Sequence, residues 1–252
     1  MKSTIVLMKC ITNLHVGSGE ENYNLVDNEV EKDCLTSYPV IHASGIKGAL
    51  REYFTNVSGI EKEDIQNIFG ADTDVKDKEN IPSKPGKIKF FQANMLAKPF
   101  RATSGDTPYH LVTTKEMIDQ FNLMQTSFLA NELQLETNAS AEIEVEEMTA
   151  NKKYSLPTNI GKFDLYLLKN TEFQSVDLPV IARNRLNNGI SEHLWFEEVV
   201  PHESLFSFVV TANDNESKWF KKFVDTIDNK VVQFGGNASI GCGFCKLCVL
   251  KK

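Results

Sequence analysis

The chain has 252 residues, enough for one large domain or two small ones with a real core. Its hydrophobic content of 41% and charged content of 24% are typical of a globular protein, and its net charge of −7 argues against a free-standing, uniformly basic nucleic-acid binder. No apolar run reaches the length of a membrane span, so we expect a cytoplasmic protein with no membrane partner.

The first third of the chain predicts a strand, a loop and two helices. Apolar and β-branched residues predict a strand over Ser3–Leu14. An apolar stripe with a 3.6-residue period then predicts a helix, with Ser44 as its N-cap. The stripe consists of Ile46, Ala49, Leu50, Tyr53, Phe54 and Val57. A shorter helix is predicted over Lys62–Phe69, and the charged, proline-containing residues of about 71–87 are predicted to form an exposed loop.

The rest of the chain continues to alternate between strands and helices. Predicted strands cover Lys89–Leu96, Phe163–Leu168, Leu178–Ala182, Leu205–Ala212, Val231–Phe234 and Phe244–Leu250. Predicted helices cover Thr114–Met124 and Glu216–Asn229. A strand, loop and helix at the start and a strand, helix and strand at the end predict an α+β fold. We interpret its core as a ferredoxin-like (RRM-like) βαββαβ unit with long insertions.

Two glycine-containing loops and one helix could contact phosphates. The loop Gly235–Gly243 has four glycines in nine residues, which would let backbone N–H groups face outward, although a tight turn is the commoner explanation. Gly17-Ser18-Gly19 is a flexible turn after the first strand. Lys47 and Arg51 share one face near a helix N-terminus, where either a phosphate site or a solvated surface is expected.

The polar residues of the N-terminal third include candidates for acid–base chemistry. Asp27 lies between apolar neighbours and could hold a divalent metal or transfer a proton, whereas a loop aspartate is more often a turn former or cap. His15 at the end of the first strand could be its partner, or a histidine with no role.

The five cysteines do not indicate a disulfide framework, because their number is odd and the chain is long. Cys242, Cys245 and Cys248 form a C-x-x-C-x-x-C pattern that resembles part of a metal site. In a strand, however, Cys245 would face away from the other two, so buried thiols in the core are the favoured interpretation.

Taken together, these motifs resemble the RAMP superfamily of CRISPR RNA-binding proteins, and within it the backbone subunits of Cmr-type (type III-B) effector complexes. The matching segments are Leu14–Gly19, Val26-Asp27, Pro39–Arg51, Ile68–Gly70, Pro179–Arg185, Trp195–Pro201 and the loop Gly235–Gly243. They span nearly the whole chain in the expected order. The chain departs from the family at Lys32, where an arginine is frequent, and Thr137–Lys153 matches no family element.

The resemblance implies a single RAMP domain over residues 1–252, with a thumb hairpin and other insertions within about 98–200. It implies copies stacked head to tail along a CRISPR guide RNA in a helical filament, with other subunits of the Cmr complex as further partners. The positions implied to hold RNA through its phosphates are Gly17, Ser18, Gly19, Ser44, Lys47, Arg51, Arg183, Arg185, Gly235, Gly236, Asn237, Ser239 and Gly241.

The resemblance also implies cleavage of the target RNA paired to the guide. Asp27 would carry this activity and hold a divalent metal, Mg²⁺ or Mn²⁺, while a 2′-hydroxyl attacks the adjacent phosphate. His15 and Glu198, or Glu197 in its place, would assist. Three alternatives remain open at this stage: a non-catalytic structural RAMP subunit, the equivalent Csm-type (type III-A) subunit, and a metal-binding domain built on the cysteines.

Overall fold

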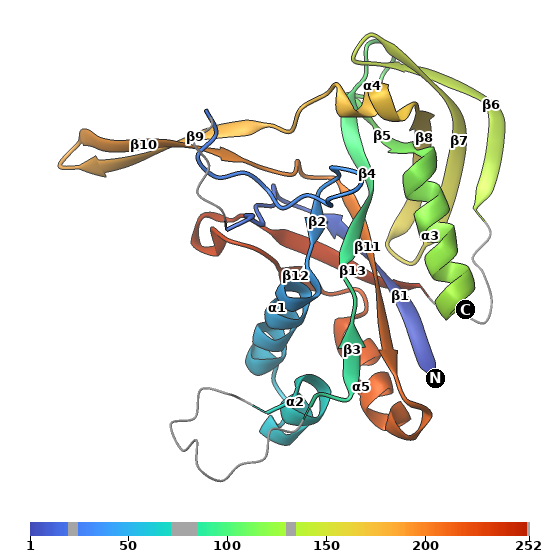
Figure 1. The fold of residues 1–252 in the computed structure, drawn as a ribbon, viewed down its shortest axis with the longest axis vertical. Helices are drawn as coiled ribbons and strands as arrows, with labels where there is room; N and C mark the ends of the chain where they lie inside the picture. Colours follow the sequence, from blue (N-terminus) through green and yellow to red (C-terminus); the bar gives the residue numbers. More distant parts are fainter. Residues whose placement is uncertain (20–24, 72–84, 130–134, 251–252) are drawn as a thin grey trace.

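A large mixed sheet organises the fold in the computed structural model, which describes residues 1–19, 25–71, 85–129 and 135–250 (Figure 1). In those ranges the main path of the sheet runs β12-β13-β1-β11-β4-β5-β8-β7-β6, with β2 paired to β4 and β3 paired to β11. A separate two-stranded hairpin, β9–β10, projects away from this sheet (Figure 1). The mixed α+β fold class predicted from the sequence is therefore confirmed.

The bounds of the elements are as follows. The strands are β1 Lys2–Cys10, β2 Val40–Ile41, β3 Ile88–Phe90, β4 Ala93–Arg101, β5 Tyr109–Thr114, β6 Glu136–Val145, β7 Met148–Thr158, β8 Gly161–Leu168, β9 Val180–Asn187, β10 Ile190–Glu198, β11 Leu205–Ala212, β12 Val231–Gln233 and β13 Phe244–Leu250. The helices are α1 Ala43–Asn56, α2 Lys62–Phe69, α3 Lys115–Phe128, α4 Asn170–Gln174 and α5 Ser217–Ile227, with short 3-10 turns at Asp214–Glu216 and Ala238–Ile240.

The first and last strands of the chain pair with each other, next to the β12 edge of the sheet. β1 lies between β11 and β13 and pairs antiparallel with both. β11 in turn pairs antiparallel with β3 and β4. Helix α1 follows β1 and precedes β3, while α5 lies between β11 and β12 in the chain. Because the N- and C-terminal strands are neighbours, loops far apart in sequence emerge side by side at the same ends of these strands.

Alternate residues of β1 face two different layers, as expected for a strand buried on both sides. Val6 and Met8 belong to a core cluster with Phe54 of α1 and Phe223 of α5, whose rings are stacked 5.7 Å apart. Leu7 faces the other cluster, which includes α3. Full burial of each of these aromatic and aliphatic side chains contributes about 1.5–3 kcal/mol, so the alternation determines how the helices pack on the sheet.

Most predicted elements lie where expected, and the differences have local causes. β1 ends at Cys10 rather than Leu14, because the chain turns at Ile11, whose N–H donates to Phe244 O. Ser44 is not the N-cap of α1: the cap is His42, two residues earlier, and the helix begins at Ala43, so that prediction was wrong. Helix α3 is one turn longer than predicted and is capped by the Thr114 hydroxyl, which accepts from Met117 N.

Two predicted strands have different bounds, and one stretch without a prediction forms strands. The predicted strand Lys89–Leu96 is two strands, because β3 ends at Phe90 and β4 starts at Ala93. The strand predicted over Leu178–Ala182 instead begins at Val180 and runs to Asn187 as half of the projecting hairpin. The unassigned stretch Thr137–Lys153 forms most of the antiparallel β6–β7 pair.

The observed helix α5, Ser217–Ile227, is shorter than the helix predicted over Glu216–Asn229, because a 3-10 turn occupies the start of the predicted range. Of the loop predicted over about 71–87, residues 72–84 lie outside the described residues. Among the helices of the described ranges, none has both the length and the apolar character of a membrane crossing.

Candidate functional site

One edge of β10 brings together candidate residues from distant parts of the sequence. The main-chain groups of Phe196 and Glu198 face away from β9 and receive the N-terminal region. Asp27 N and Asn28 N each donate to Phe196 O at 3.1 Å, and Glu198 N donates to Asn28 O at 2.9 Å. His15 Nδ1 lies 2.7 Å from Glu198 O. His15 and Asp27 are thus held by strand positions two residues apart, which is about 7 Å along a strand.

The carboxylate of Asp27 is exposed and anchored by one oxygen. Its Oδ2 accepts a hydrogen bond of 2.7 Å from Phe196 N. The Asp27 residue is exposed, and among the described residues no hydrogen bond to Oδ1 is formed. The arrangement orients the carboxylate through the backbone of β10 while leaving one oxygen available to a ligand.

The imidazole of His15 is buried and its orientation is determined by its backbone partner. Because Glu198 O is a carbonyl and can only accept, Nδ1 carries the proton of the neutral ring and Nε2 carries the lone pair. A Cβ at Gly17 would lie 3.1 Å from Nε2. Glycine at position 17 therefore keeps the basic nitrogen of His15 from being blocked.

The adjacent acidic residues Glu197 and Glu198 point to opposite sides of β10, as alternation requires. The Glu198 carboxylate accepts from Val30 N at 3.1 Å and from Lys32 Nζ at 3.0 Å. It therefore fixes the segment that follows Asp27 in the chain.

Glu197 faces the glycine loop instead, where it accepts from Asn237 Nδ2 at 2.9 Å. Burial alone would raise the pKa of Glu197, but hydrogen bonds from Trp195 and Arg183 outweigh it and lower that pKa below its usual value. Glu197 is therefore ionised at neutral pH.

The loop Gly235–Gly243 is a tightly packed turn. Gly235 has φ +74°, and a Cβ there would lie 2.2 Å from His15 O; Gly243 has φ +80°, and a Cβ there would lie 1.9 Å from Phe234 O. Both positions require glycine, because the backbone is left-handed there and because a neighbouring carbonyl oxygen leaves no room for a Cβ. Gln233 clamps the loop, since its Nε2 lies 3.0–3.3 Å from the carbonyls of Phe234, Gly235 and Cys242.

Several N–H groups of this loop are already used inside the protein, contrary to the expectation that they face outward. Gly236 N donates to His15 O at 2.9 Å and Gly243 N donates to Asn13 O at 2.8 Å. Gly241 N and Cys242 N bond within the loop itself. The loop therefore holds the His15 backbone in place, and contacts with a polyanion would fall to its exposed residues, which include Ser239.

The other predicted RNA contacts lie on surfaces around this edge. Gly17 pairs with Val30 as an isolated bridge, and Ser18 N donates to Glu29 O at 3.2 Å, so the Gly17–Gly19 turn runs beside the segment after Asp27. Ser44 lies exposed in the first turn of α1, and Lys47 and Arg51 follow on that helix, both half-buried.

The two predicted arginines of β9 have different environments. Arg185 is exposed, whereas the side chain of Arg183 is only 21% exposed. Arg183 Nε donates to Glu197 Oε2 at 3.0 Å, and its Nη2 lies 3.6 Å from Cys242 Sγ. The assignment of RNA contact to these residues stays a prediction, but the hydrogen bonds of Arg183 are directed into the protein.

The cysteines are all free thiols and do not converge. Cys245 and Cys248 lie in different core clusters on opposite faces of β13, as the strand alternation predicted. Cys245 Sγ is instead 3.8 Å from Cys10 Sγ on β1. That hydrogen bond and complete burial raise the pKa of Cys10 well above its usual value. Among the described residues there is no group of three or more His, Cys, Asp or Glu side chains placed to hold a metal.

A buried lysine lies behind the Asp27 edge. Lys98 is 5% exposed and lines a cavity of about 250 Å³ together with Lys32, Tyr38 and Glu198. Its ammonium donates to Val176 O at 2.5 Å and lies within 4.9 Å of two phenylalanine ring centroids. Burial lowers the pKa of Lys98 to about 8, although the carboxylates of Asp177 and Glu198 act in the opposite direction.

This depressed pKa predicts a specific pH dependence of stability. Between about pH 8 and 10.5 the unfolded chain binds the Lys98 proton more tightly than the folded one, so folding stability rises with pH across that window. Below about pH 8, keeping the Lys98 ammonium charged in the folded protein lowers the free energy of unfolding by up to ~3 kcal/mol. We expect wild type to gain stability relative to Lys98→Met between pH 8 and pH 10, measured by urea unfolding. The same dependence of unfolding free energy on pH in the two proteins would contradict this.

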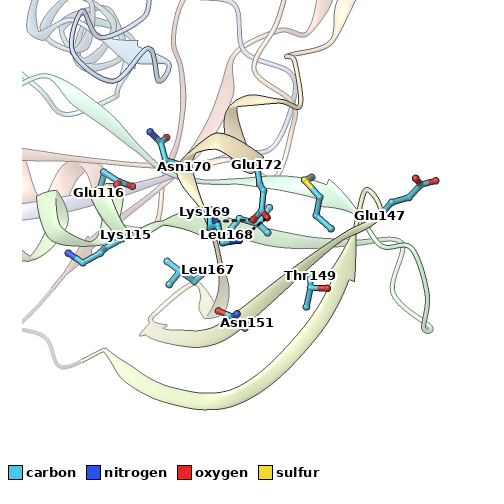
Figure 2. A pocket seen from close by; sticks show the side chains of 11 residues that line it. Lys115, Glu116, Glu147, Thr149, Asn151, Leu167, Leu168, Lys169, Asn170 and Glu172 are labelled. Atoms are coloured by element: carbon cyan, nitrogen blue, oxygen red, sulfur yellow. Dashed lines mark hydrogen bonds and ion pairs between the residues drawn. The ribbon is translucent and has the colours of Figure 1, made fainter.

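A separate hollow of about 730 Å³ lies between α3, α4 and the β7–β8 pair (Figure 2). Figure 2 shows its wall to be polar, with Lys115 and Glu116 at one side and Glu147 and Thr149 at the other. Lys169 and Glu172 in this wall pair with each other at 3.5 Å. None of the predicted site residues lines this hollow, whereas Glu198 lines the smaller cavity behind β10.

Sequence reasoning missed several residues that build the site. Gln233, Asn13 and Lys98 had no assigned role, yet they hold the glycine loop, its neighbouring turn and the cavity behind β10. Lys98 did carry a signal, because it is a lysine inside the apolar strand segment Ala93–Phe100. Asn13 carried none, since its partners His202 and Gly243 come from the other end of the chain. Gln233 carried none either, although its partners are close in sequence, because no pattern indicates that its amide closes the loop.

Comparison with known proteins gives consistent matches over the whole chain. The model of the RAMP superfamily matches residues 7–246. The chain is 27% identical to the CRISPR system Cmr endoribonuclease Cmr4 of Pyrococcus furiosus, with 98% of this chain and 95% of that protein covered. It is 33% identical over 114 residues to the CRISPR system CMR subunit Cmr4 of Saccharolobus solfataricus, covering 44% of this chain and 34% of the relative.

Solved structures show the same fold. A chain of the type III-B Cmr-β complex bound to cognate target RNA superposes with a TM-score of 0.78 at 24% identity, covering 99% of this chain and 97% of the other. Oligomeric Cmr4 from Pyrococcus furiosus superposes with a TM-score of 0.72 at 22% identity, covering 99% of this chain and 98% of the other.

Proposed function

Because this chain belongs to the RAMP superfamily, we propose that it is the backbone subunit of a Cmr-type complex that binds guide RNA and cleaves the paired target RNA. The observation that carries the proposal is the exposed Asp27 carboxylate, held beside His15 on the edge of β10. A purely structural subunit has no need of such an arrangement. The named Cmr-type relatives favour this class over the Csm-type alternative.

The arrangement of the central strands supports a ferredoxin-like palm within a single RAMP domain over residues 1–252. A βαββαβ unit requires four antiparallel strands in a fixed order and two connecting helices. The strand order here is β13-β1-β11-β3/β4, antiparallel throughout, and the connecting helices are α1 and α5. The projecting β9–β10 hairpin lies within the predicted insertion region and is the thumb in this proposal (Figure 1).

In the proposed reaction, the chain's own residues orient the target and move a proton. His15 Nε2 has its lone pair available because Nδ1 is held by Glu198 O, so it can accept the proton of a 2′-hydroxyl as that oxygen bonds to the adjacent phosphorus. The bond from phosphorus to the 5′-oxygen of the next nucleotide then breaks, and that oxygen takes up a proton from water. Asp27 lies nearby along the strand edge, where a phosphate could approach from solvent. The Glu198 carboxylate holds Val30 and Lys32 and so supports the backbone of the Asp27 segment.

The residues also fit a divalent cation of the Mg²⁺ or Mn²⁺ type. Asp27 presents one carboxylate oxygen to solvent, and Mg²⁺ is commonly held by one or two carboxylates together with substrate phosphates and water. Bound there, the cation would offset the negative charge that develops on the phosphate. Asp27 Oδ1 is the atom of this chain that would hold it.

RNA binding in this proposal depends on a narrow set of residues and not on net charge. Lys47, Arg51 and Arg185 would contact phosphates, with Ser44, Ser239 and the Gly17–Gly19 turn providing close approach. Base pairing would supply the sequence specificity. Stacking of several copies with the other subunits along one guide RNA would assemble a continuous basic groove from an acidic protein.

We expect Lys47→Glu to weaken guide-RNA binding and to reduce the slope of log affinity against log salt by at least about one unit. The matched control is Lys62→Glu, the same charge reversal on an exposed lysine of α2, which should leave binding unchanged. Affinities would be measured by fluorescence anisotropy across a salt titration. Identical salt slopes for wild type and Lys47→Glu would contradict α1 as a guide contact.

The direct test of the proposed function is cleavage by the complete assembly. The chain would be expressed with its neighbouring subunits and guide RNA, purified, and incubated with complementary RNA and Mg²⁺ or Mn²⁺. We expect cuts at regular intervals in the complementary RNA and none in an unrelated RNA. A purified, guide-loaded assembly that leaves complementary RNA intact would overturn the proposal.

A further inference from the structure

A single buried carboxylate joins three parts of the proposed active centre. Glu197 is 6% exposed, and both of its oxygens are engaged. Oε1 accepts from Trp195 Nε1 at 2.9 Å, while Oε2 accepts from Arg183 Nε at 3.0 Å and from Asn237 Nδ2 at 2.9 Å. The donors belong to β10, to β9 and to the glycine loop. Glu197 therefore connects both strands of the hairpin to the loop that holds His15.

Arg183 makes the same connection from the opposite strand. It lies directly across from Trp195 in the β9–β10 register and bridges Glu197 to Cys242, near the far end of the glycine loop. The ion pair between Arg183 and Glu197 lies within the hairpin, and its two members reach the uncharged loop through Cys242 and Asn237. Arg185, two residues further on the same face, is exposed and offers the contrasting case of an arginine directed to solvent.

The position of Glu197 in the strand makes this connection relevant to the chemistry. Its neighbours Phe196 and Glu198 present their main-chain groups to Asp27 and His15 on the other edge of β10. A shift or rotation of β10 would therefore move both candidate catalytic groups at once. The glycine loop binds His15 O through Gly236 N, so the loop and β10 hold His15 from two sides.

We infer that Arg183 and Glu197 are positioning residues that lock the β9–β10 hairpin against the Gly235–Gly243 loop and thereby align Asp27 and His15. This inference rests on the proposed function and assigns Arg183 a role other than phosphate contact. Misplacement of reacting groups by about 1 Å costs on the order of 100-fold in rate, so losing the lock should lower turnover more than RNA affinity.

The experiment compares Arg183→Gln, Glu197→Gln, the double variant and Arg185→Gln in the guide-loaded assembly. We expect each of the first two to lower single-turnover cleavage at saturating assembly by about 10- to 100-fold, with the salt slope of RNA binding unchanged. The double variant should be no more than about threefold slower than either single variant, because the two residues act as one unit. Arg185→Gln should instead weaken binding and reduce the salt slope by about one.

A second measurement does not depend on cleavage. Hydrogen exchange of the Gly235–Gly243 amides should accelerate in Glu197→Gln and not in Arg185→Gln, and it can be measured even if the wild-type assembly fails to cleave. Wild-type failure would overturn the proposed function alone. If the wild-type assembly cleaves and both Arg183→Gln and Glu197→Gln cleave at that same rate, the inference alone would be overturned. A reduced salt slope for Arg183→Gln would also overturn it, since that result identifies Arg183 as a phosphate contact.

Discussion

Asp27→Ala is expected to lower target cleavage by roughly 10²–10⁴-fold, the range that a positioned acid–base or charge-stabilising group contributes. The substitution removes an exposed carboxylate at the β10 edge together with the hydrogen bond from Phe196 N. That bond is exposed and contributes about 1 kcal/mol, so the protein should still fold, assemble and bind guide RNA. Single-turnover cleavage and guide-RNA affinity would be measured on the same preparation.

Two further variants separate charge from structure at this position. Asp27→Asn keeps an oxygen that can accept from Phe196 N but removes the charge, so it should lose nearly as much cleavage as Asp27→Ala. Asp106→Ala removes an aspartate from an exposed loop and should cleave as wild type. If Asp27→Ala still cleaves at the wild-type rate in the guide-loaded assembly, Asp27 has no catalytic role.

Gly235→Ala is expected to destabilise the protein by about 2–4 kcal/mol and to impair cleavage as well. Left-handed backbone at a non-glycine residue costs roughly 1–2 kcal/mol, and Gly235 has φ +74°. The new Cβ would also lie 2.2 Å from His15 O, which must move and lose its hydrogen bond from Gly236 N, at a cost of about 1 kcal/mol or more. Urea unfolding would measure the loss of stability.

Gly241→Ala is the matched control for this effect. Gly241 has φ +82°, but a Cβ there would meet no atom within 4 Å. It should therefore show the backbone cost alone, about 1–2 kcal/mol, without displacement of His15 O. Equal losses of stability in the two variants would show that contact with His15 O does not determine the conformation of the loop.

The elements that follow from sequence are those whose pattern is local. The apolar stripe of α1 predicted its buried residues Ile46, Leu50 and Phe54, and the apolar run of β11 predicted a strand buried in the sheet. The residue pattern did not predict the β9–β10 hairpin, because its largely exposed strands carry no clear alternation, and a thumb hairpin was expected only from the family resemblance. The β6–β7 pair escaped for a similar reason, since β6 is largely exposed.

The candidate site was predicted in part. Asp27, His15 and the glycine loop were identified from their residue types and from the resemblance to a family, and the structure places them around one strand edge. The roles of Glu197 and Arg183 could not be predicted, because nothing local in the sequence indicates that one is paired with the other. The sequence also suggested outward-facing N–H groups in the glycine loop, whereas many of them are used to hold the His15 and Asn13 backbone.

The sequence by itself determined the α+β class, the main helices, the family, and the residue types from which a site could be built. These follow from hydrophobic periodicity and from motifs whose spacing is local. Only the tertiary structure decided which of those residues meet. β1 and β13 pair, so the two ends of the chain come together, and β10 then receives Asp27 and His15 on one edge and Arg183 and Asn237 around Glu197. Contacts between residues so distant in the chain depend on strand pairing and packing, which no local pattern encodes.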